Sequence, residues 1–240
     1  MLRSLIMTLL LSAAPAQAQQ LRETGLELVL LADASGSIDA QELAFQRQGY
    51  AEALTDPMVL DAIESSIYGS IAVTYVEWAT NTAQVVDWTI IAGPDSATAF
   101  ADALMTTPQR AFGRNAIGTA LMEGMRLITD NDIRAPRAVI DFSGDSIRNS
   151  SGPNISTARA AVLEAGITIN ALPILRPEDG RRAGSNLEAE YQERIIGGPG
   201  AFMVTAESRA TFAEAVRRKL FLEIAGHTPQ SFDFAKLDPD

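Results

Sequence analysis

The sequence predicts an α/β fold, a doubly wound three-layer sandwich with a mostly parallel central sheet and one antiparallel edge strand. From residue 26 onward, short apolar or β-branched runs alternate with longer amphipathic stretches, which is typical of such a sheet. The first run, Leu26 to Ala32, is apolar apart from Glu27, as expected for a central strand covered on both faces. Only the short polar turn at residues 80–82 separates two later runs, which indicates an antiparallel hairpin.

The remaining elements follow from the same alternation. Asp39 and Glu42 are placed like a capping box at the start of a helix. Residues 176–186, rich in charge, proline and glycine, are expected to form a surface loop. The glycine-rich turn at residues 197–200 does not fit a nucleotide-binding loop, because a strand follows it where a helix would be required. The expected strands are residues 26–32, 71–78, 84–91, 138–142, 166–172 and 202–205, and the expected helices are residues 39–54, 96–105, 117–129, 156–165, 187–195 and 207–224.

The first eighteen residues have the pattern of a secretory signal peptide. Arg3 precedes an almost entirely apolar run from Leu5 to Ala14, and the sequence Ala16-Gln17-Ala18 is typical of a cleavage site. A membrane anchor would need roughly twenty apolar residues, about twice this run. We therefore expect cleavage after Ala18 and a secreted or periplasmic protein without stable membrane insertion. The expected organisation is a signal peptide at residues 1–18, one folded domain at 19–225 and a C-terminal tail at 226–240.

The composition limits the chemistry of the mature chain. Cleavage would leave 18 basic and 30 acidic residues, which argues against nucleic acid or anionic lipid as the main partner. No cysteine is present, so burial of the 47% hydrophobic content must support the fold without disulfides. The histidine is His227, and the lysines are Lys219 and Lys236. A histidine-based triad, a multi-histidine zinc site and a phosphate-binding lysine after a glycine loop therefore lack the residues they need.

Two acidic loops follow central strands of the predicted sheet. The loop Asp33-Ala34-Ser35-Gly36-Ser37 comes after the first strand, and Ser143-Gly144-Asp145-Ser146 follows the strand at 138–142. Open α/β sheets bind ligands at the carboxyl ends of their strands, where the strand order reverses. Residues i, i+2 and i+4 of an extended chain face the same side, so Asp33, Ser35 and Ser37 would present three oxygens together.

Such oxygens indicate that the loops bind a hard cation and that this cation could bind a protein partner. Carboxylate and hydroxyl oxygens suit Mg²⁺, Mn²⁺ or Ca²⁺ better than zinc or copper. Hydroxyls and water do not neutralise a doubly charged ion, so a site with one or two carboxylates still attracts an anionic oxygen. A carboxylate from a protein partner would complete the shell. The metal would then act as an adhesion element without any bond being broken.

These features together resemble a von Willebrand factor type A domain and its metal-ion-dependent adhesion site (MIDAS). The resemblance rests on the aspartate-serine-serine loop, the helix behind it, the hairpin strands and Asp145, and it covers roughly residues 25–225. Within that superfamily, three segments resemble a group of exported bacterial proteins of unknown function. They are Tyr75-Val76-Glu77-Trp78, Val139-Ile140-Asp141-Phe142-Ser143-Gly144-Asp145 and Ile196-Gly197-Gly198-Pro199-Gly200-Ala201-Phe202.

The resemblance implies a set of metal ligands. Ser35 and Ser37 would bind the ion directly, and Asp33 would act through water. The second loop of the family usually offers a threonine, but residues 115–121, aligned on their Gly118 and Leu121, have Asn115 at that position. An amide oxygen can also bind a metal, and Thr119, which is expected on the helix, is the weaker candidate.

The third loop of the family usually reads aspartate-glycine, and Asp145-Ser146 is the nearest match. Asp141 is the competing carboxylate. It lies within the strand, where burial is costly unless the charge is paired, so it is interpreted as a supporting group or as the partner of an arginine. The expected metal site therefore consists of Asp33, Ser35, Ser37, Asn115 and Asp145.

Three functions remain open at this point. The favoured one is a metal-dependent protein-binding module, for adhesion or scaffolding, that is not an enzyme. The second is a metal-dependent phosphatase or phosphotransferase with Asp33 as nucleophile, although such enzymes have a second aspartate in place of Ser35 and a mid-chain lysine. The third is a scaffold that has lost its metal, which the replacement of threonine by Asn115 leaves open.

Several of these residues also have structural interpretations. Ser37 or Asp39 would serve as an ordinary helix N-cap. Trp78 and Trp88 lie within strand runs, so they are expected to pack in the sheet rather than stack on a sugar. The basic run at residues 217–219 is expected to form a solvated face near a helix C-terminus, where positive charge is favoured.

Overall fold

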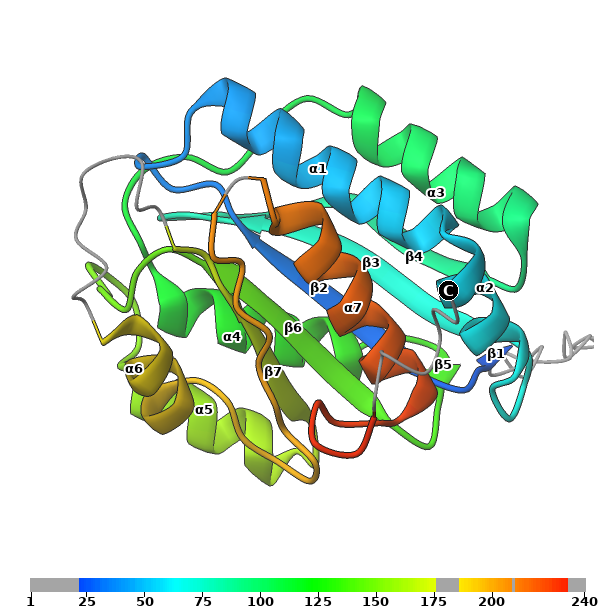
Figure 1. Ribbon diagram of the computed structural model, residues 1–240. Coiled ribbons are helices and arrows are strands. Elements are labelled where there is room, and N and C mark those ends of the chain that lie inside the picture. The colour runs from blue at the N-terminus through cyan, green and yellow to red at the C-terminus, as the bar shows by residue number, and fades with distance from the viewer. Residues whose placement is uncertain (1–21, 176–185, 209, 233–240) are drawn as a thin grey trace, which may run out of the picture.

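The computed structural model describes residues 22–175, 186–208 and 210–232. At its centre is a five-stranded sheet in the order β4-β3-β2-β6-β7 (Figure 1). Neighbouring strands are parallel except for β3 and β4, which form an antiparallel hairpin at one edge. The strands are β2 (Glu27–Asp33), β3 (Ile71–Trp78), β4 (Thr82–Ile91), β6 (Ala138–Gly144) and β7 (Thr168–Pro173). The predicted fold class is thereby confirmed.

Helices cover both faces of the sheet (Figure 1). One face carries α1 (Ala40–Thr55), α3 (Pro94–Thr106) and α7 (Phe212–Ala225), with α2 (Pro57–Glu64) beside α7. The other face carries α4 (Ile117–Thr129), α5 (Ile155–Glu164) and α6 (Leu187–Arg194). Each face buries its own apolar cluster, which makes the molecule a three-layer sandwich. None of the helices in the described ranges is both long and apolar enough to cross a bilayer.

The strand order brings two loops together at the carboxyl ends of the parallel strands, which is the edge of the sheet where the candidate site lies. The central strand β2 pairs with β3 on one side and with β6 on the other, so the order of the strands reverses at β2. Leu31 of β2 is in register with Phe142 of β6. The loops that follow Asp33 and Gly144 therefore leave the sheet side by side, at the kind of switch point where open α/β sheets bind ligands.

The structure also contains three short elements that the sequence analysis does not predict: α2, β1 (Arg22–Glu23) and β5 (Ile133–Arg134). The start of α2 carries a local signal, because Asp56 accepts a hydrogen bond from the Met58 N–H at 2.9 Å and Pro57 occupies the first turn. A helix of eight residues is too short for its periodicity to be evident.

Two predicted elements near the C-terminus are corrected. The strand expected at residues 202–205 is wrong, since this segment pairs with β7 only through an isolated bridge between Met203 and Ala171. The last helix begins at Phe212 rather than at Glu207. The predicted signal peptide and the loop residues 176–185 lie outside the described residues.

A capping box starts α1, as predicted. Asp39 Oδ1 accepts hydrogen bonds from the N–H groups of Gln41 and Glu42, both at 2.8 Å. The Glu42 carboxylate accepts the Asp39 N–H at 3.0 Å. This reciprocal arrangement satisfies donors that the first turn of a helix leaves without partners, and it ends the loop that begins at Asp33.

Replacing the cap should destabilise the protein measurably. Asp39→Ala removes the acceptor for two N–H groups, so the free energy of unfolding should fall by about 1 kcal/mol. Urea denaturation checks this value. Asp39→Asn keeps an acceptor oxygen and should lose less than half as much; equal losses in both variants would contradict the capping role.

Candidate functional site

The first loop, residues 33–37, turns directly after β2, and its polar side chains lie close together. Asp33 and Ser35 are fully buried, and Ser37 is partly exposed. Asp33 Oδ1 accepts a hydrogen bond from the Ser35 N–H at 2.8 Å, which stabilises the turn. The Oγ atoms of Ser35 and Ser37 lie 3.3 Å apart. The two hydroxyls therefore face the same point, as their spacing along the chain predicts.

The carboxylate of Asp145, the residue after β6, lies beside the two serine hydroxyls. The Ser37 hydroxyl donates to Asp145 Oδ1 at 3.4 Å. This distance and the 3.3 Å between the two serine oxygens are longer than an ordinary O–H···O bond of roughly 2.5–3.0 Å. They match the separation of adjacent oxygen ligands on a divalent cation, about 3.0 Å at magnesium's bond length and about 3.4 Å at calcium's. The donors and their spacing fit a hard cation.

Asp33 has an unusual electrostatic environment. Its Oδ2 atom is buried and accepts no hydrogen bond from any described residue. Gly144 permits close packing here, because a Cβ at this position would lie 3.1 Å from Asp33 Oδ2 and 2.9 Å from the Trp78 ring. Burial, and then the negative charge of Asp145, raise the pKa of Asp33 to about 7. A nearby cation would favour the ionised carboxylate, so this unpartnered oxygen also fits a metal site.

The loop before α4 reaches the same edge of the sheet. The Gly36 N–H donates to the Gly113 carbonyl at 2.7 Å, and the Ser150 N–H donates to the Asn115 carbonyl at 2.7 Å. Asn115 therefore lies between the first loop and the segment that follows Asp145. Its Nδ2 atom is buried and has no hydrogen-bond partner within the described residues. Turning the amide by 180° would put its oxygen, a possible metal ligand, in that position.

Other residues singled out in the sequence have structural roles. Thr119 lies on α4 with its hydroxyl against the third loop, since a Cβ at Gly152 would be 2.1 Å from its Oγ1. Trp78 is buried and stacks on Phe142 with ring centroids 5.0 Å apart. The Trp88 indole N–H donates to a backbone carbonyl of α4 at 3.2 Å. The predicted packing of both tryptophans in the sheet is confirmed.

Asp141, the competing carboxylate, faces a different set of partners. Its Oδ1 lies 2.7 Å from the Nζ of Lys219 on α7. Lys219 also pairs with Glu223, and the Glu223 carboxylate accepts a hydrogen bond from Asn170 at 2.9 Å. These side chains are all buried. The geometry thus groups Asp145 with the serines, whereas Asp141 belongs to a buried ion cluster under α7.

This cluster corrects two predictions. The partner of Asp141 is a lysine and not an arginine. The solvated face expected at residues 217–219 is wrong for Lys219, whose side chain is fully buried. The helical spacing of Phe212, Val216, Lys219 and Glu223 places the ionic pair on the same inward stripe as the apolar residues. The helical spacing of Lys219 and Glu223 with the apolar residues therefore indicates burial, although charged residues are usually exposed.

A protein-family model described as "Protein of unknown function (DUF1194)" matches residues 23–228. The chain belongs to this family. The matched range includes the first loop, the third loop and the whole central sheet of the DUF1194 protein. No curated protein matches the chain.

Solved structures similar to this chain include von Willebrand factor domains, among them a von Willebrand factor type A protein from Catenulispora acidiphila with a TM-score of 0.55 at 16% identity, over 84% of this chain and 43% of that chain. Proximal thread matrix protein 1 from the mussel byssus has a TM-score of 0.58 at 15% identity, over 84% of this chain and 46% of that chain. The type V pili tip protein Mfa5 from Porphyromonas gingivalis has a TM-score of 0.58 at 9% identity, over 88% and 98%. BatB from Bacteroides thetaiotaomicron has a TM-score of 0.53 at 18% identity, over 84% and 100%. The chain therefore has a von Willebrand factor type A fold, and it spans less than half of the mussel protein.

One of the mussel-protein structures has a zinc-occupied MIDAS motif. In the DUF1194 protein, the described residues contain no group of three or more His, Cys, Asp or Glu side chains suited to a metal ion. A metal beside the first loop would therefore need the hydroxyls of Ser35 and Ser37 as well as the carboxylates of Asp33 and Asp145.

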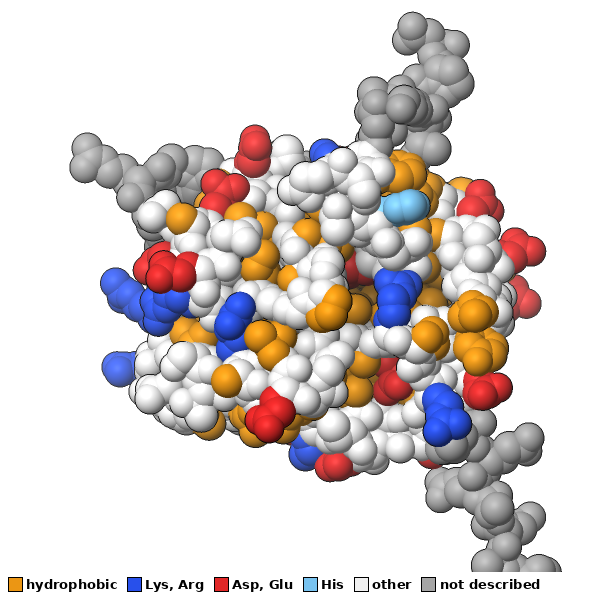
Figure 2. All heavy atoms as spheres, turned by 90° about the horizontal axis from the view of Figure 1, so that it is seen from below, with side chains coloured by type: hydrophobic (Ala, Val, Ile, Leu, Met, Phe, Trp, Pro, Cys, Tyr) orange, Lys and Arg blue, Asp and Glu red, His pale blue; other side chains and the backbone are white. Residues whose placement is uncertain are grey.

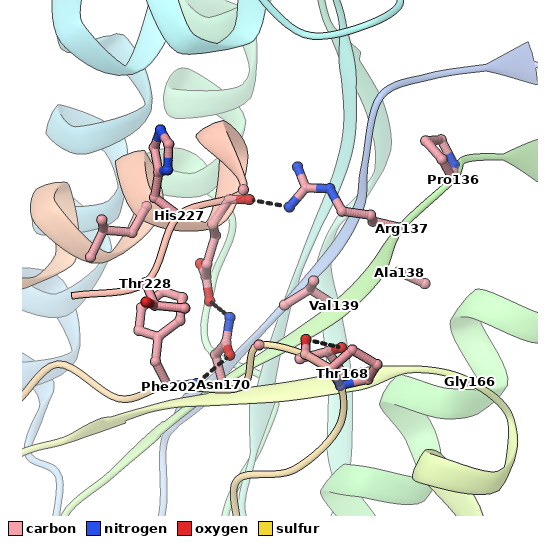
Figure 3. A pocket seen from close by; sticks show the side chains of 15 residues that line it. Pro136, Arg137, Ala138, Val139, Gly166, Thr168, Asn170, Phe202, His227 and Thr228 are labelled. Atoms are coloured by element: carbon pink, nitrogen blue, oxygen red, sulfur yellow. Dashed lines mark hydrogen bonds between the residues drawn. The ribbon is translucent and has the colours of Figure 1, made fainter. Parts of the chain in front are cut away.

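A hollow of about 260 Å³ lies at the opposite edge of the sheet, where β6 and β7 begin (Figure 3). Arg137 donates to the carbonyls of Glu223 and Ile224 at 2.7 and 2.8 Å, at the end of α7. Asn170 accepts the Phe202 N–H at 3.0 Å. Figure 2 shows the single histidine of the chain near hydrophobic side chains on the face that it presents. The Arg137 and Asn170 contacts hold α7 and the segment around Phe202 in place, which is a structural role.

Lys219 should contribute strongly to stability. Lys219→Met preserves much of the side-chain volume but leaves Asp141 and Glu223 buried without a cation, so the free energy of unfolding should fall by about 3–5 kcal/mol. Arg218→Met, at the exposed neighbouring position, should change it by less than about 1 kcal/mol. Similar losses in the two variants, measured by urea denaturation, would show that the cluster is not what stabilises α7.

The cluster should also make stability depend on pH. Burial, followed by the charge of Asp141, raises the pKa of Glu223 from 4.5 to about 7. The contribution of the neutral carboxyl is therefore full below pH 4.5 and is lost as the pH rises through 7. Glu223→Gln stays neutral throughout, so between pH 5 and 8 it should gain stability relative to the wild type by up to about 3 kcal/mol.

Urea denaturation of both proteins at several pH values measures this gain. Asp33, whose pKa is also raised, is present in both proteins, so its contribution cancels in the difference. A difference between the proteins that stays constant from pH 5 to pH 8 would rule out Glu223 as the titrating group.

Proposed function

We propose that this protein is an exported module that binds a protein partner through a divalent cation, Mg²⁺, Mn²⁺ or Ca²⁺, and that it is not an enzyme. The observation that carries the proposal is the convergence of Ser35, Ser37 and Asp145 at 3.3 and 3.4 Å. These oxygens come from the ends of two adjacent parallel strands, next to the buried carboxylate of Asp33.

Each residue has a distinct task in this proposal. Ser35 and Ser37 supply neutral oxygens, and Asp145 supplies a charged one. Asp33 holds the turn through its bond to the Ser35 N–H and contributes a second negative charge to the site. Asn115 is the candidate from the loop before α4. When bound, the cation supplies an electrophilic position that a carboxylate of the partner can fill.

The arrangement offers little support for catalysis at Asp33. Ser35 stands where a metal-dependent phosphotransferase would have a second aspartate. Lys219 is buried in an ion pair with Asp141, and Lys236 lies outside the described residues. Export is proposed from the signal pattern of residues 1–18.

Metal binding should raise the melting temperature of the purified protein. A ligand at a hundredfold its Kd stabilises the folded state by about 2.7 kcal/mol, which corresponds to about 5–10 °C for a chain of this size. Mg²⁺ or Mn²⁺ should produce such a shift in the wild type, and Asp33→Ala should remove it. Scanning fluorimetry with and without EDTA measures the shift.

Asp87→Ala is the matched control, because Asp87 is exposed on the edge strand β4. This variant should retain the full metal-dependent shift. An equal shift in Asp33→Ala and in the wild type would mean that the ion binds elsewhere, and no shift with Mg²⁺, Mn²⁺ or Ca²⁺ would remove the metal from the proposal.

A further inference from the structure

The loop between α3 and α4 forms a rigid rim beside the proposed metal site. The turn between β3 and β4 holds its backbone at several points. The Thr80 N–H donates to the Phe112 carbonyl at 3.2 Å, and the Arg114 N–H donates to Thr80 Oγ1 at 2.8 Å. Asn81 accepts the Phe112 N–H and donates to the Arg110 carbonyl, both at 2.9 Å. The tip of the loop is therefore tied to the sheet and not free to collapse.

A buried ion pair holds the start of the same loop. Arg47 of α1 pairs with Glu77 of β3 and donates to the carbonyls of Leu104 and Thr107. Glu77 also accepts the Arg110 N–H at 3.4 Å. Arg47 and Glu77 are both almost completely buried, so α1, β3 and the loop are connected beneath the surface. The rim is thus supported at its base as well as at its tip.

This rigid loop keeps a large aromatic side chain in solvent. Phe112 is 58% exposed, although the backbone around it is fully engaged. Gly113, with φ of +107° and only 2.5 Å between a hypothetical Cβ and Thr80 Oγ1, permits the tight turn that follows Phe112. Its carbonyl accepts the Gly36 N–H of the first loop. The exposed ring therefore stands next to the loop that carries Ser35 and Ser37.

Positive charge accompanies the aromatic ring. Arg114 and Arg148 are exposed, and they lie within three residues of Asn115 and Asp145 respectively. Neither guanidinium forms an ion pair with any carboxylate in residues 22–175, 186–208 and 210–232. The exposed carboxylate of Asp39, at the N-terminus of α1, accepts the N–H groups of Gln41 and Glu42. Two exposed arginines therefore flank the proposed metal site in a chain of net charge −11.

We propose that Phe112, Arg114 and Arg148 form a recognition surface for an acidic protein segment in which an aromatic or branched aliphatic residue lies close to the metal-binding carboxylate. The inference rests on the proposed metal function. Asp33 and Asp145 together balance the formal charge of a divalent ion, so long-range attraction for an acidic segment comes from the two arginines. A rigid, exposed aromatic ring offers apolar contact at a low cost in conformational entropy.

A random heptapeptide library displayed on phage provides the probe. The full chain is immobilised in Mg²⁺, and bound phage are eluted with EDTA. The recovered peptides should contain Asp or Glu within about three residues of an aromatic or branched aliphatic residue. Synthetic peptides of the recovered sequences should bind Phe112→Ala about tenfold more weakly than the wild type, whereas Phe112→Leu should retain most of the affinity.

Two matched control variants test whether a loss of peptide affinity is specific to the rim. Tyr68→Ala removes another exposed aromatic ring, and Arg134→Ala removes another exposed guanidinium. Both lie near the opposite edge of the sheet, before β3 and in β5, and should leave affinity unchanged. Arg114→Ala and Arg148→Ala should weaken binding more in low salt than in high salt.

The outcomes distinguish this inference from the proposed function. If Mg²⁺ stabilises the protein but acidic peptides bind Phe112→Ala as tightly as the wild type, the rim proposal is wrong and the metal site stands. The rim proposal also fails if no peptide is recovered by EDTA, if the peptides lack an acidic residue, or if Mg²⁺ instead joins two copies of the chain. If no metal stabilises the protein, the proposed function itself fails.

Discussion

The parallel register between β2 and β6 is the constraint on which the functional architecture depends. Because these strands run side by side and end at the same edge, the loop after Asp33 and the loop after Gly144 must share one small volume. A shift of register by one residue would move each side chain of β2 from one apolar layer to the other and would separate Ser37 from Asp145. The apolar layers on both faces, built around residues such as Tyr50 and Phe142, stabilise this register and therefore the site.

Most of the fold follows from the sequence because its elements combine strong local signals. The strand β3 and the helix α4 begin and end where the sequence predicts, and the capping box at Asp39 identifies the start of α1. The sequence does not predict α2, because a helix of eight residues is too short to show a clear period. The apolar composition of residues 202–205 does not show whether the segment completes a ladder with β7. Pairing with β7 depends on tertiary contacts that composition does not encode.

The candidate site was predictable in part. The approach of Asp145 follows from sheet topology. The expectation that Ser35 and Ser37 lie together is met, but through a turn in which Asp33 accepts the Ser35 N–H and Ser35 accepts the Ile38 N–H, and not through an extended chain. The buried roles of Lys219 and Glu223 did not follow, because charged residue types favour an exposed assignment unless a partner is known. Their partners Asp141 and Asn170 belong to distant strands, so only the folded structure reveals the pairing.

The strand β6 brings a carboxylate to two different places. Asp141, within β6, belongs to the buried ion cluster under α7, and Asp145, directly after β6, lies with Ser35 and Ser37 at the candidate metal site. Asp141 and Asp145 are separated by one short segment of β6, yet one faces a lysine and the other faces serines. Lys219 thus balances the carboxylate of Asp141, whereas the carboxylate of Asp145 lies beside Ser37 at the proposed cation site. This division explains why two neighbouring aspartates have different environments.

The way in which Phe112 is held has a consequence for how the protein can change over evolutionary time. Its loop is tied down by backbone groups and by the side chains of Thr80, Asn81 and Arg47, and the aromatic ring itself contributes nothing to that attachment. A substitution at residue 112 that keeps the N–H donated to Asn81 should therefore cost little folding free energy. The scaffold therefore tolerates other side chains at this one position, so that what it recognises can change while the fold does not.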